Sequence, residues 1–293
     1  MADFLQQFVA GLGAGAIYAS LALALVLIYQ FTGIVNFAQG ELAMFATYIA
    51  WTFVNAGMSF WLALVLTLAI SFAGGMAIER VIIRPVEGAP VLTLVIVTVG
   101  LFILVNALAG WIWSFLIKDF PNPFPDGALR AGGVSLGYST LGVLAVVAGV
   151  MGLLYLMFRY TKVGLGMRAV ATNPDSARLV GIRVGWMLAF GWGLAAMVGA
   201  VSGILVAPLL FLEPNMMGGV LIYAFAAATL GGFDSPAGAV VGGLIVGVAE
   251  TLAGSYVDAI GSDLKIGVPL AIILGVLLLR PQGLFGRAAV ERA

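Results

Sequence analysis

The sequence predicts an all-α, polytopic integral membrane bundle of about eight or nine transmembrane or partly re-entrant helices. Of 293 residues, 62% are hydrophobic and only 9% charged, and the mean hydropathy is +1.15. A soluble domain carries roughly 25% charged residues, so that class is disfavoured. Many uncharged stretches reach about 20 residues, which is enough to cross a hydrocarbon core of about 30 Å. Forty glycines suit helices that pack closely in lipid.

The charge and the missing residue types exclude several classes of function. The formal net charge is zero, so there is no basic field for binding nucleic acid. The chain has no Cys, which excludes disulfides and thiolate metal sites. It also has no His, the commonest general base and metal ligand. We therefore expect no cofactor on this chain, and an intramembrane enzyme is strongly disfavoured.

The uncharged stretches place the helices in order along the chain. The first begins near Phe8 and is not a signal peptide, because no basic residue precedes Arg80. The last three helices are short and glycine-rich, so one pair of them is a candidate for half-helices. The predicted helices are 8–29, 37–55, 60–79, 91–113, 138–158, 186–210, 218–232, 236–253 and 266–280.

Basic residues orient the bundle, because Lys and Arg in short loops mark the cytoplasmic side. Ten of the thirteen fall on one side of the predicted topology: Arg80, Arg84, Arg159, Lys162, Arg168, Arg178, Arg183, Arg280, Arg287 and Arg292. Lys118, Arg130 and Lys265 fall on the other. A single transmembrane domain, 1–293, then has a cytoplasmic loop at about 159–185, an external loop at about 114–137 and a cytoplasmic C-terminus. Nine crossings put the N-terminus outside, whereas eight, with 31–41 re-entrant, put it inside.

The segment 31–41 interrupts the apolar pattern. Thr32 and Gly33 break the first helix, and Asn36 can cap a new one with Gln39 bonding back, as in a capping box. A helix that begins at membrane depth points free N–H groups and a positive dipole end at a substrate carboxylate or carbonyl. The alternative is a helix-loop-helix at the cytoplasmic interface whose polar groups are hydrated.

Two acidic residues, Glu41 and Glu250, lie in apolar surroundings. An ionised acid at a helix centre costs roughly 2.5–3.5 kcal/mol, so each should face protein or water. With Asn36 and Gln39 they are the candidates for lining a translocation path. Outside this set, Asn106, Glu213 and Asn215 fall near the outer boundary, where they either shape an entrance or are simply hydrated.

The stretch IERVIIRPVEG closes the third helix on the inner side. Basic groups such as Arg80 and Arg84 complement the dipole at a helix C-terminus. The sequence therefore requires no special role for them or for Glu79. Recurrent glycine pairs four residues apart, such as Gly11 with Gly15 and Gly243 with Gly247, predict faces of helix contact.

The basic loop 159–183 carries the marks of a short surface helix. Asn173 can cap it, Pro174 suits its first position, Asp175 complements its dipole and Gly181 ends it. A helix of about seven residues is unstable alone, so packing on its own bundle or on a partner must hold it.

Six stretches together resemble the permease subunits, in particular the shorter of the two, of high-affinity branched-chain amino-acid ABC importers (Liv-type). They occur in the family's order along nearly the whole chain. They are GAIYASLALALVLIY (15–29), GIVNFAQGELAMFATY (33–48), IERVIIRP (78–85), RAVATNPDSARLVGI (168–182), TLGGFDSPAGAVVGGLIVGVAETL (229–252) and PQGLFGR (281–287).

The resemblance implies a subunit of the bacterial cytoplasmic (inner) membrane that imports branched-chain, hydrophobic amino acids. Its partners would be a second homologous permease, two cytoplasmic ATPase subunits, a periplasmic binding protein and the lipid bilayer, with no nucleic acid. ATP and Mg would bind the ATPases, and the chain itself lacks a G-x-x-x-x-G-K-[ST] phosphate loop. The resemblance assigns ATPase coupling to Arg168, Asn173, Asp175, Ala177, Arg178 and Gly181.

The chain departs from the family pattern at two positions. Gln39 replaces the usual His, which removes any protonation-linked role there, and Asp234 replaces a Gly, which adds a charge to the last glycine-rich connection. Related permeases handle urea, short amides or other amino acids, so the cargo stays open. A self-contained secondary transporter is the rival class, with Glu41 and Glu250 as ion-coupled carboxylates and helices broken at 31–41 and 231–236.

Overall fold

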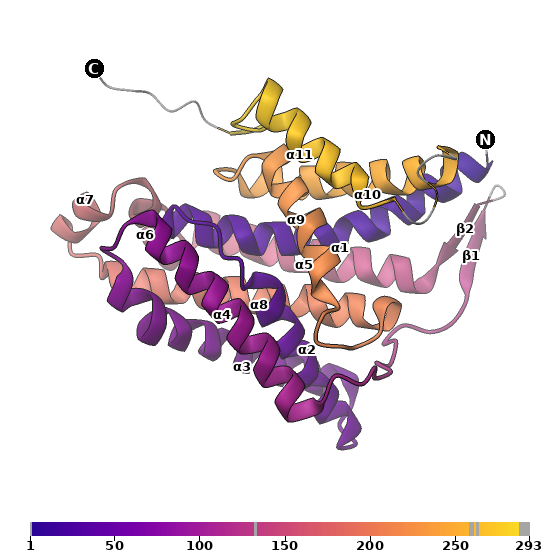
Figure 1. The fold of residues 1–293 in the computed structure, drawn as a ribbon, viewed down its shortest axis with the longest axis horizontal. Coiled ribbons are helices and arrows are strands. Elements are labelled where there is room, and N and C mark those ends of the chain that lie inside the picture. Colours follow the sequence, from indigo (N-terminus) through magenta and orange to yellow (C-terminus); the bar gives the residue numbers. More distant parts are fainter. Residues whose placement is uncertain (1, 132–133, 258–260, 262–263, 287–293) are drawn as a thin grey trace. The chain divides into compact units, whose positions relative to one another are not determined.

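The computed structural model describes residues 2–131, 134–257, 261 and 264–286. Over these residues the chain forms eleven α-helices and one two-stranded hairpin (Figure 1). Arg287 and Arg292, two of the basic residues used for orientation, lie outside the described part. The helices are α1 (Ala2–Thr32), α2 (Gln39–Asn55), α3 (Phe60–Ile78), α4 (Val91–Trp113), α5 (Tyr138–Tyr160), α6 (Lys162–Thr172), α7 (Pro174–Leu179), α8 (Val184–Leu210), α9 (Met217–Gly231), α10 (Pro236–Tyr256) and α11 (Gly267–Leu279).

The prediction of an all-α polytopic membrane bundle is confirmed. Within the described residues, six helices are long and apolar enough to cross a membrane, and α9 and α11 are shorter apolar helices. Each of the nine predicted helices has a counterpart, most with ends within about two residues. The number of crossings and the side of each terminus stay predictions.

Contacts divide the chain into two compact units, each described by itself. Unit 1 comprises Met1–Val26, Phe124–Ala145 and Gly219–Ala293. Unit 2 comprises Leu27–Pro123 and Val146–Gly218. Three helices, α1, α5 and α9, contribute residues to both units. The prediction of a single domain over 1–293 is not tested by this division.

Glycines bring α1 and α10 into backbone contact in unit 1. A Cβ on Gly11 would lie 2.7 Å from the Cα of Val248, and one on Gly15 would lie 2.9 Å from the carbonyl oxygen of Gly243. Only residues without a side chain permit this approach. The predicted contact role of these glycine pairs is therefore confirmed.

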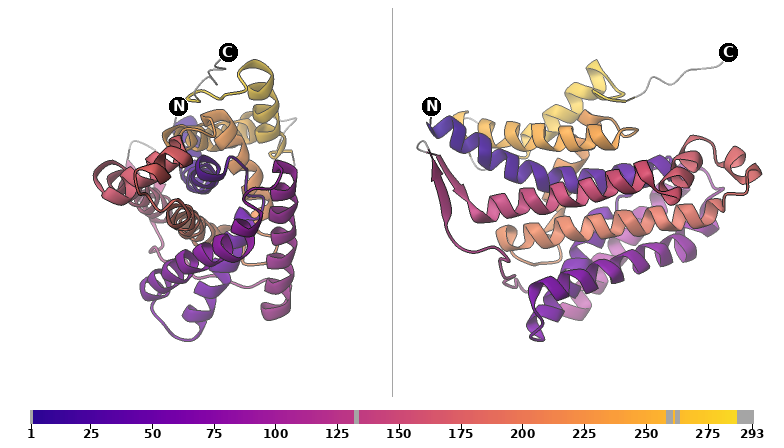
Figure 2. Two further views of the ribbon diagram at one scale, coloured as in Figure 1. Left: turned by 90° about the vertical axis from the view of Figure 1, so that its left-hand side faces the viewer. Right: turned by 180° about the vertical axis from the view of Figure 1, so that it is seen from behind.

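In unit 2, α8 is the central helix, and α2 and α3 pack along it (Figure 2). In the most apolar stretch of α8, 78% of the residues are buried, whereas in that of α4 only 22% are buried. Gly75 of α3 fits against the backbone of α8, because a Cβ there would lie 2.5 Å from the Trp192 carbonyl oxygen. Helix α8 thus carries the core of this unit, and α4 lies towards its surface.

Three local features differ from the prediction. Helix α1 begins about six residues earlier, and the predicted external loop contains antiparallel strands β1 (Ala128–Ala131) and β2 (Val134–Gly137). Helix α6 forms where the sequence predicts a loop. The loop prediction followed from Gly164 and Gly166, which lower the intrinsic helix propensity. Packing outweighs that propensity: a Cβ on Gly164 would lie 2.5 Å from the Cα of Phe158.

The last glycine-rich connection joins α9 to α10. Gly232 has a φ of +96°, and Ser235 caps α10 by accepting a hydrogen bond from the Gly238 N–H at 3.0 Å. Asp234, the departure from the family pattern, is exposed. The added charge therefore lies at the surface of the unit, where it needs no buried counter-charge.

Candidate functional site

The turn between α1 and α2 buries its two polar side chains, although Gly33 and Phe37 of the same turn are exposed. Asn36 and Gln39 each have 0% exposure. The Asn36 Oδ1 accepts a hydrogen bond from the Ala38 N–H at 3.1 Å, and its Nδ2 donates to the Gln39 Oε1 at 3.2 Å. The predicted capping box is wrong, because α2 begins at Gln39 with Ala38 at its N-cap and no side-chain capping bond. Asn36 and Gln39 do pair, but through their side chains.

Contacts of this turn place the start of α2 level with the middle of neighbouring spans. The Gln39 Nε2 donates to the carbonyl oxygen of Ala195, which lies near the middle of α8, at 3.0 Å. Ala38 packs with Leu101 and Val105 from the middle of α4. The alternative in which these polar groups are hydrated is therefore wrong for Asn36 and Gln39, whereas the depth of the turn in the membrane stays a prediction. Helix α2 begins inside the bundle.

Glu41 lies in the first turn of α2 and is 2% exposed. The Asn106 Nδ2 from α4 lies 3.2 Å from the Glu41 Oε2, 3.0 Å from the Pro214 carbonyl oxygen and 3.2 Å from the Asn215 Oδ1. An amide has two N–H donors, so at most two of these acceptors are satisfied at once. In the described part of the chain, no Lys or Arg lies within 4.0 Å of Glu41. The site thus brings α2, α4 and the segment 214–215 together around a carboxyl group that has no basic side chain beside it in the described residues.

Glu250 belongs to unit 1 and has different neighbours. The Tyr18 hydroxyl donates to the Glu250 Oε2 at 3.0 Å. The rings of Tyr18 and Tyr223 stack with centroids 4.5 Å apart and an interplanar angle of 6°. The four predicted path residues therefore have three separate sets of partners: Asn36 and Gln39 bond each other and α8, Glu41 meets Asn106, and Glu250 meets Tyr18. Neither tyrosine was predicted, since no local sequence signal indicates an aromatic pair from helices so far apart along the chain.

The predicted surface helix in the basic loop is present as α7. The Asn173 Oδ1 accepts a hydrogen bond from the Ser176 N–H at 2.9 Å, and Pro174 occupies the first turn. Asp175 pairs with Arg178 at 2.9 Å, and Gly181 ends the segment with a φ of +84°. Each capping and stop signal thus has the structural role that the sequence predicted.

One face of α7 is buried and its end is exposed. Ala177 is 3% exposed and packs in a cluster with Val170, Val184 and Leu188. Leu179 and Val180 are 89% and 75% exposed. Charges and caps do not indicate these two apolar side chains, which were therefore not predicted. Arg168 and Arg178 are also exposed.

Comparisons with known proteins agree with this architecture. Residues 7–277 match the family described as "Branched-chain amino acid transport system / permease component". The permease LivH of Salmonella typhimurium is 31% identical over 99% of this chain and 97% of its own length. BraD of Pseudomonas aeruginosa is 30% identical over 99% and 98%. Both are described as permease proteins of high-affinity branched-chain amino acid transport systems.

Two further comparisons reach more distant proteins. The galactose/methyl galactoside import permease MglC of Escherichia coli is 28% identical over 66% of this chain and 57% of its own length. A solved structure of PsaBC from Streptococcus pneumoniae has a TM-score of 0.50 with 14% identity, over 95% of this chain and 92% of that chain. This last likeness concerns the fold alone. On the family match and the near-complete alignment with LivH and BraD, the chain belongs to the family of branched-chain amino acid transport system permease components.

Proposed function

We propose that this chain is the membrane-spanning permease subunit of an ATP-driven importer that carries branched-chain, hydrophobic amino acids across the bacterial cytoplasmic membrane. A second homologous permease, two cytoplasmic ATPase subunits and a periplasmic binding protein complete the importer. ATP and Mg bind the ATPases. The observation that carries this proposal is α7, a capped surface helix with an exposed apolar end in a chain that has no phosphate loop of its own.

Helix α7 suits the role of a coupling helix because it is anchored on one face and open on the other. Ala177 holds it on the bundle, so this residue acts by positioning the helix. Asp175, Arg178 and Leu179 are exposed, so they can contact an ATPase groove. Apolar side chains that are removed from water on binding favour association. Arg168 and Gly181 flank this surface, and Asn173 caps the helix that carries it.

The Glu41 site suits a segment of the translocation path. An amino-acid cargo carries an ammonium group, and the Glu41 carboxyl group has no Lys or Arg within 4.0 Å among the described residues. Asn106 and Asn215 offer further polar groups next to it. Cargo bound here supplies the missing positive charge, whereas Glu250 with Tyr18 is a second polar site in unit 1.

Family membership favours this importer over a self-contained secondary transporter. The cargo has an alternative, because the resemblance also covers importers for urea, amides or other amino acids. Purifying the chain from membranes with its ATPases and binding protein, and measuring which compounds that binding protein binds, distinguishes the two candidates.

Changes to α7 should uncouple the permease from its ATPases. Asp175→Lys removes the Arg178 ion pair and reverses the charge at the helix N-terminus, and Gly181→Val forces a β-branched residue to a φ of +84°. Leu179→Asp places a charge on the exposed apolar end. We expect ATPase association to weaken by about tenfold or more with Leu179→Asp, because full burial of a leucine side chain contributes about 1.5–3 kcal/mol. Co-purification and uptake in proteoliposomes measure the effects.

A matched control for these variants is Asp126→Lys, which reverses an exposed carboxylate outside the basic loop. It should leave ATPase association unchanged. If the three α7 variants retain both normal association and normal uptake, the assignment of coupling to this helix is wrong.

The buried turn is tested by Asn36→Ala and Gln39→Ala. Each variant removes one partner of a buried hydrogen bond and leaves the other unsatisfied, which costs about 1–3 kcal/mol. If the turn lines the path, these variants should change cargo selectivity or maximal uptake. Competition uptake assays with several amino acids measure both quantities. Unchanged selectivity and rate in both variants would return the turn to a purely structural role.

A further inference from the structure

The end of α3 that is predicted to be cytoplasmic carries an ion pair between Glu79 and Arg84. Glu79 begins a π-helical turn, Glu79–Ile83, in which the Arg84 N–H bonds to the Glu79 carbonyl oxygen. This hydrogen bond joins residues five apart, as in a π-helix, and it brings the two residues to the same side of the helix. The Arg84 Nε and Nη2 lie 3.2 and 3.1 Å from the Glu79 Oε1, and Nη2 lies 3.0 Å from the Oε2.

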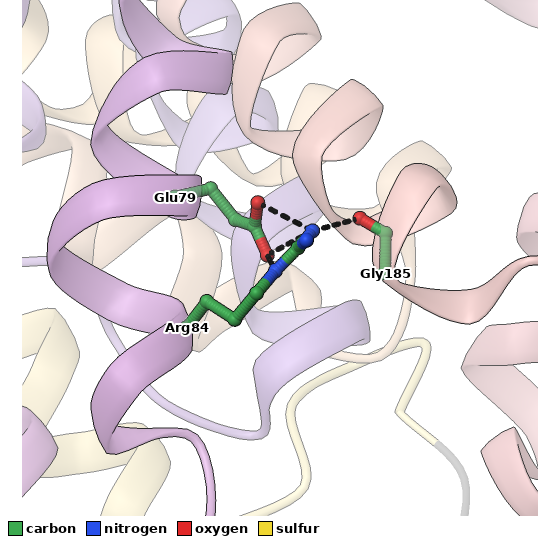
Figure 3. A network of polar contacts seen from close by, with 3 residues as sticks. All are labelled: Glu79, Arg84 and Gly185. Carbon is green, nitrogen blue, oxygen red and sulfur yellow. Dashed lines mark hydrogen bonds and ion pairs between the residues drawn. The ribbon is translucent and has the colours of Figure 1, made fainter.

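The same guanidinium group reaches a second helix (Figure 3). The Arg84 Nη2 also donates to the carbonyl oxygen of Gly185, in the first turn of α8. A Cβ at position 185 would lie 3.0 Å from Nη2, a tight contact that would shift the end of the Arg84 side chain slightly. The Glu79 side chain is 2% exposed and that of Arg84 is 32% exposed. Arg84 thus neutralises a buried acid and ties α3 to α8.

The first turn of α8 is also where α7 attaches. Gly181, Ile182 and Arg183 are the only residues between Val180 at the end of α7 and the start of α8. Ala177 of α7 packs in the same cluster as Val184 and Leu188 of α8. A displacement of α7 therefore moves the first turn of α8, and with it the carbonyl group that Arg84 holds.

Space beside the ion pair permits such a movement. A cavity of about 180 Å³ borders Glu79 and Arg84, with Thr32, Leu188 and Trp192 in its wall. Close-packed interiors transmit displacement and resist rearrangement. A cavity at this point lets the guanidinium group and the π-helical turn move without displacing a packed side chain.

We propose that Arg84 is a positioning residue for coupling, through which displacement of α7 and the first turn of α8 reaches the cytoplasmic end of α3. This proposal rests on the proposed importer function. Arg84 contributes the bidentate pair with Glu79 and the third bond to Gly185 at once. Lysine carries the same charge but lacks the planar fork that makes these contacts together.

The test uses the complete importer, with its ATPases and binding protein, in proteoliposomes. The double variant E79Q/R84M removes both charges together, so that no unpaired buried charge remains. We expect it to bind the ATPases normally but to hydrolyse at least about 5-fold more ATP per cargo molecule, the lower range of coupling between sites. R84K should recover part of the wild-type ratio. The matched control is R80M, which removes an exposed charge from the same π-helical turn.

Labelling of a single cysteine gives a second readout, because the chain has no native Cys. In the Thr32→Cys background, the labelling rate at the cavity should differ between nucleotide-free and ATP-bound importer, and E79Q/R84M should abolish that difference. The proposal would be overturned if the double variant hydrolysed as much ATP per cargo molecule as the wild type and its labelling still depended on nucleotide. So would loss of both E79Q/R84M and R84K from membranes while R80M accumulates, since Arg84 would then be a folding residue. Failure of the unmodified chain to bind ATPases would instead refute the importer function.

Discussion

Glu41→Gln is expected to lower maximal cargo uptake by about tenfold or more without destabilising the protein. The loss follows from the missing charge, because a hydrogen bond to a charged group contributes about 1.5–3 kcal/mol. Glutamine keeps the shape of the side chain and an acceptor for Asn106. It also removes an acid whose ionised form costs roughly 2.5–3.5 kcal/mol at a helix centre. Uptake should therefore fall while thermal stability in detergent stays the same or rises.

The opposite directions of these two effects make the prediction specific. Asp119→Asn is the matched control, because Asp119 is an exposed carboxylate in the same unit. It should leave uptake and stability unchanged. Normal uptake by Glu41→Gln would remove Glu41 from the path, and a large fall in stability would show that its carboxyl group is mainly structural.

Gly15→Leu is expected to disrupt unit 1. A Cβ at this position already lies 2.9 Å from both the Gly243 carbonyl oxygen and the Cα of Leu244, and both are backbone atoms. Overpacking costs typically 1–3 kcal/mol, and here the backbone cannot move aside as a side chain does. We expect lower accumulation in membranes and a melting temperature reduced by at least about 5 °C.

The control for this change is Gly275→Leu in α11, where a Cβ meets no atom within 4 Å. Both glycines belong to apolar helices of unit 1, so hydrophobicity and helix propensity change equally. Gly15→Ala should give an intermediate effect, since it adds the Cβ alone. If Gly15→Leu accumulates and melts like Gly275→Leu, the contact between α1 and α10 does not limit stability.

The signals that sequence reasoning used for α7 were local, which is why they were reliable. A cap at Asn173, a proline at the first position and a glycine with positive φ act within a few residues of one another. Helix positions follow from apolar length in the same way. Helix α6 was missed because its stability comes from contact between Gly164 and Phe158, and local propensity does not report that contact.

Composition, apolar length and capping residues were enough to establish the membrane bundle, the positions of its helices and the surface helix of the basic loop. Only the tertiary structure showed that Asn36 and Gln39 are buried at the level of Ala195, that Asn106 reaches Glu41, and that Arg84 joins α3 to α8. The physical reason is the range of the interactions. Caps and apolar runs act between near neighbours, whereas a buried polar group is satisfied by whichever distant helix the packing brings alongside it.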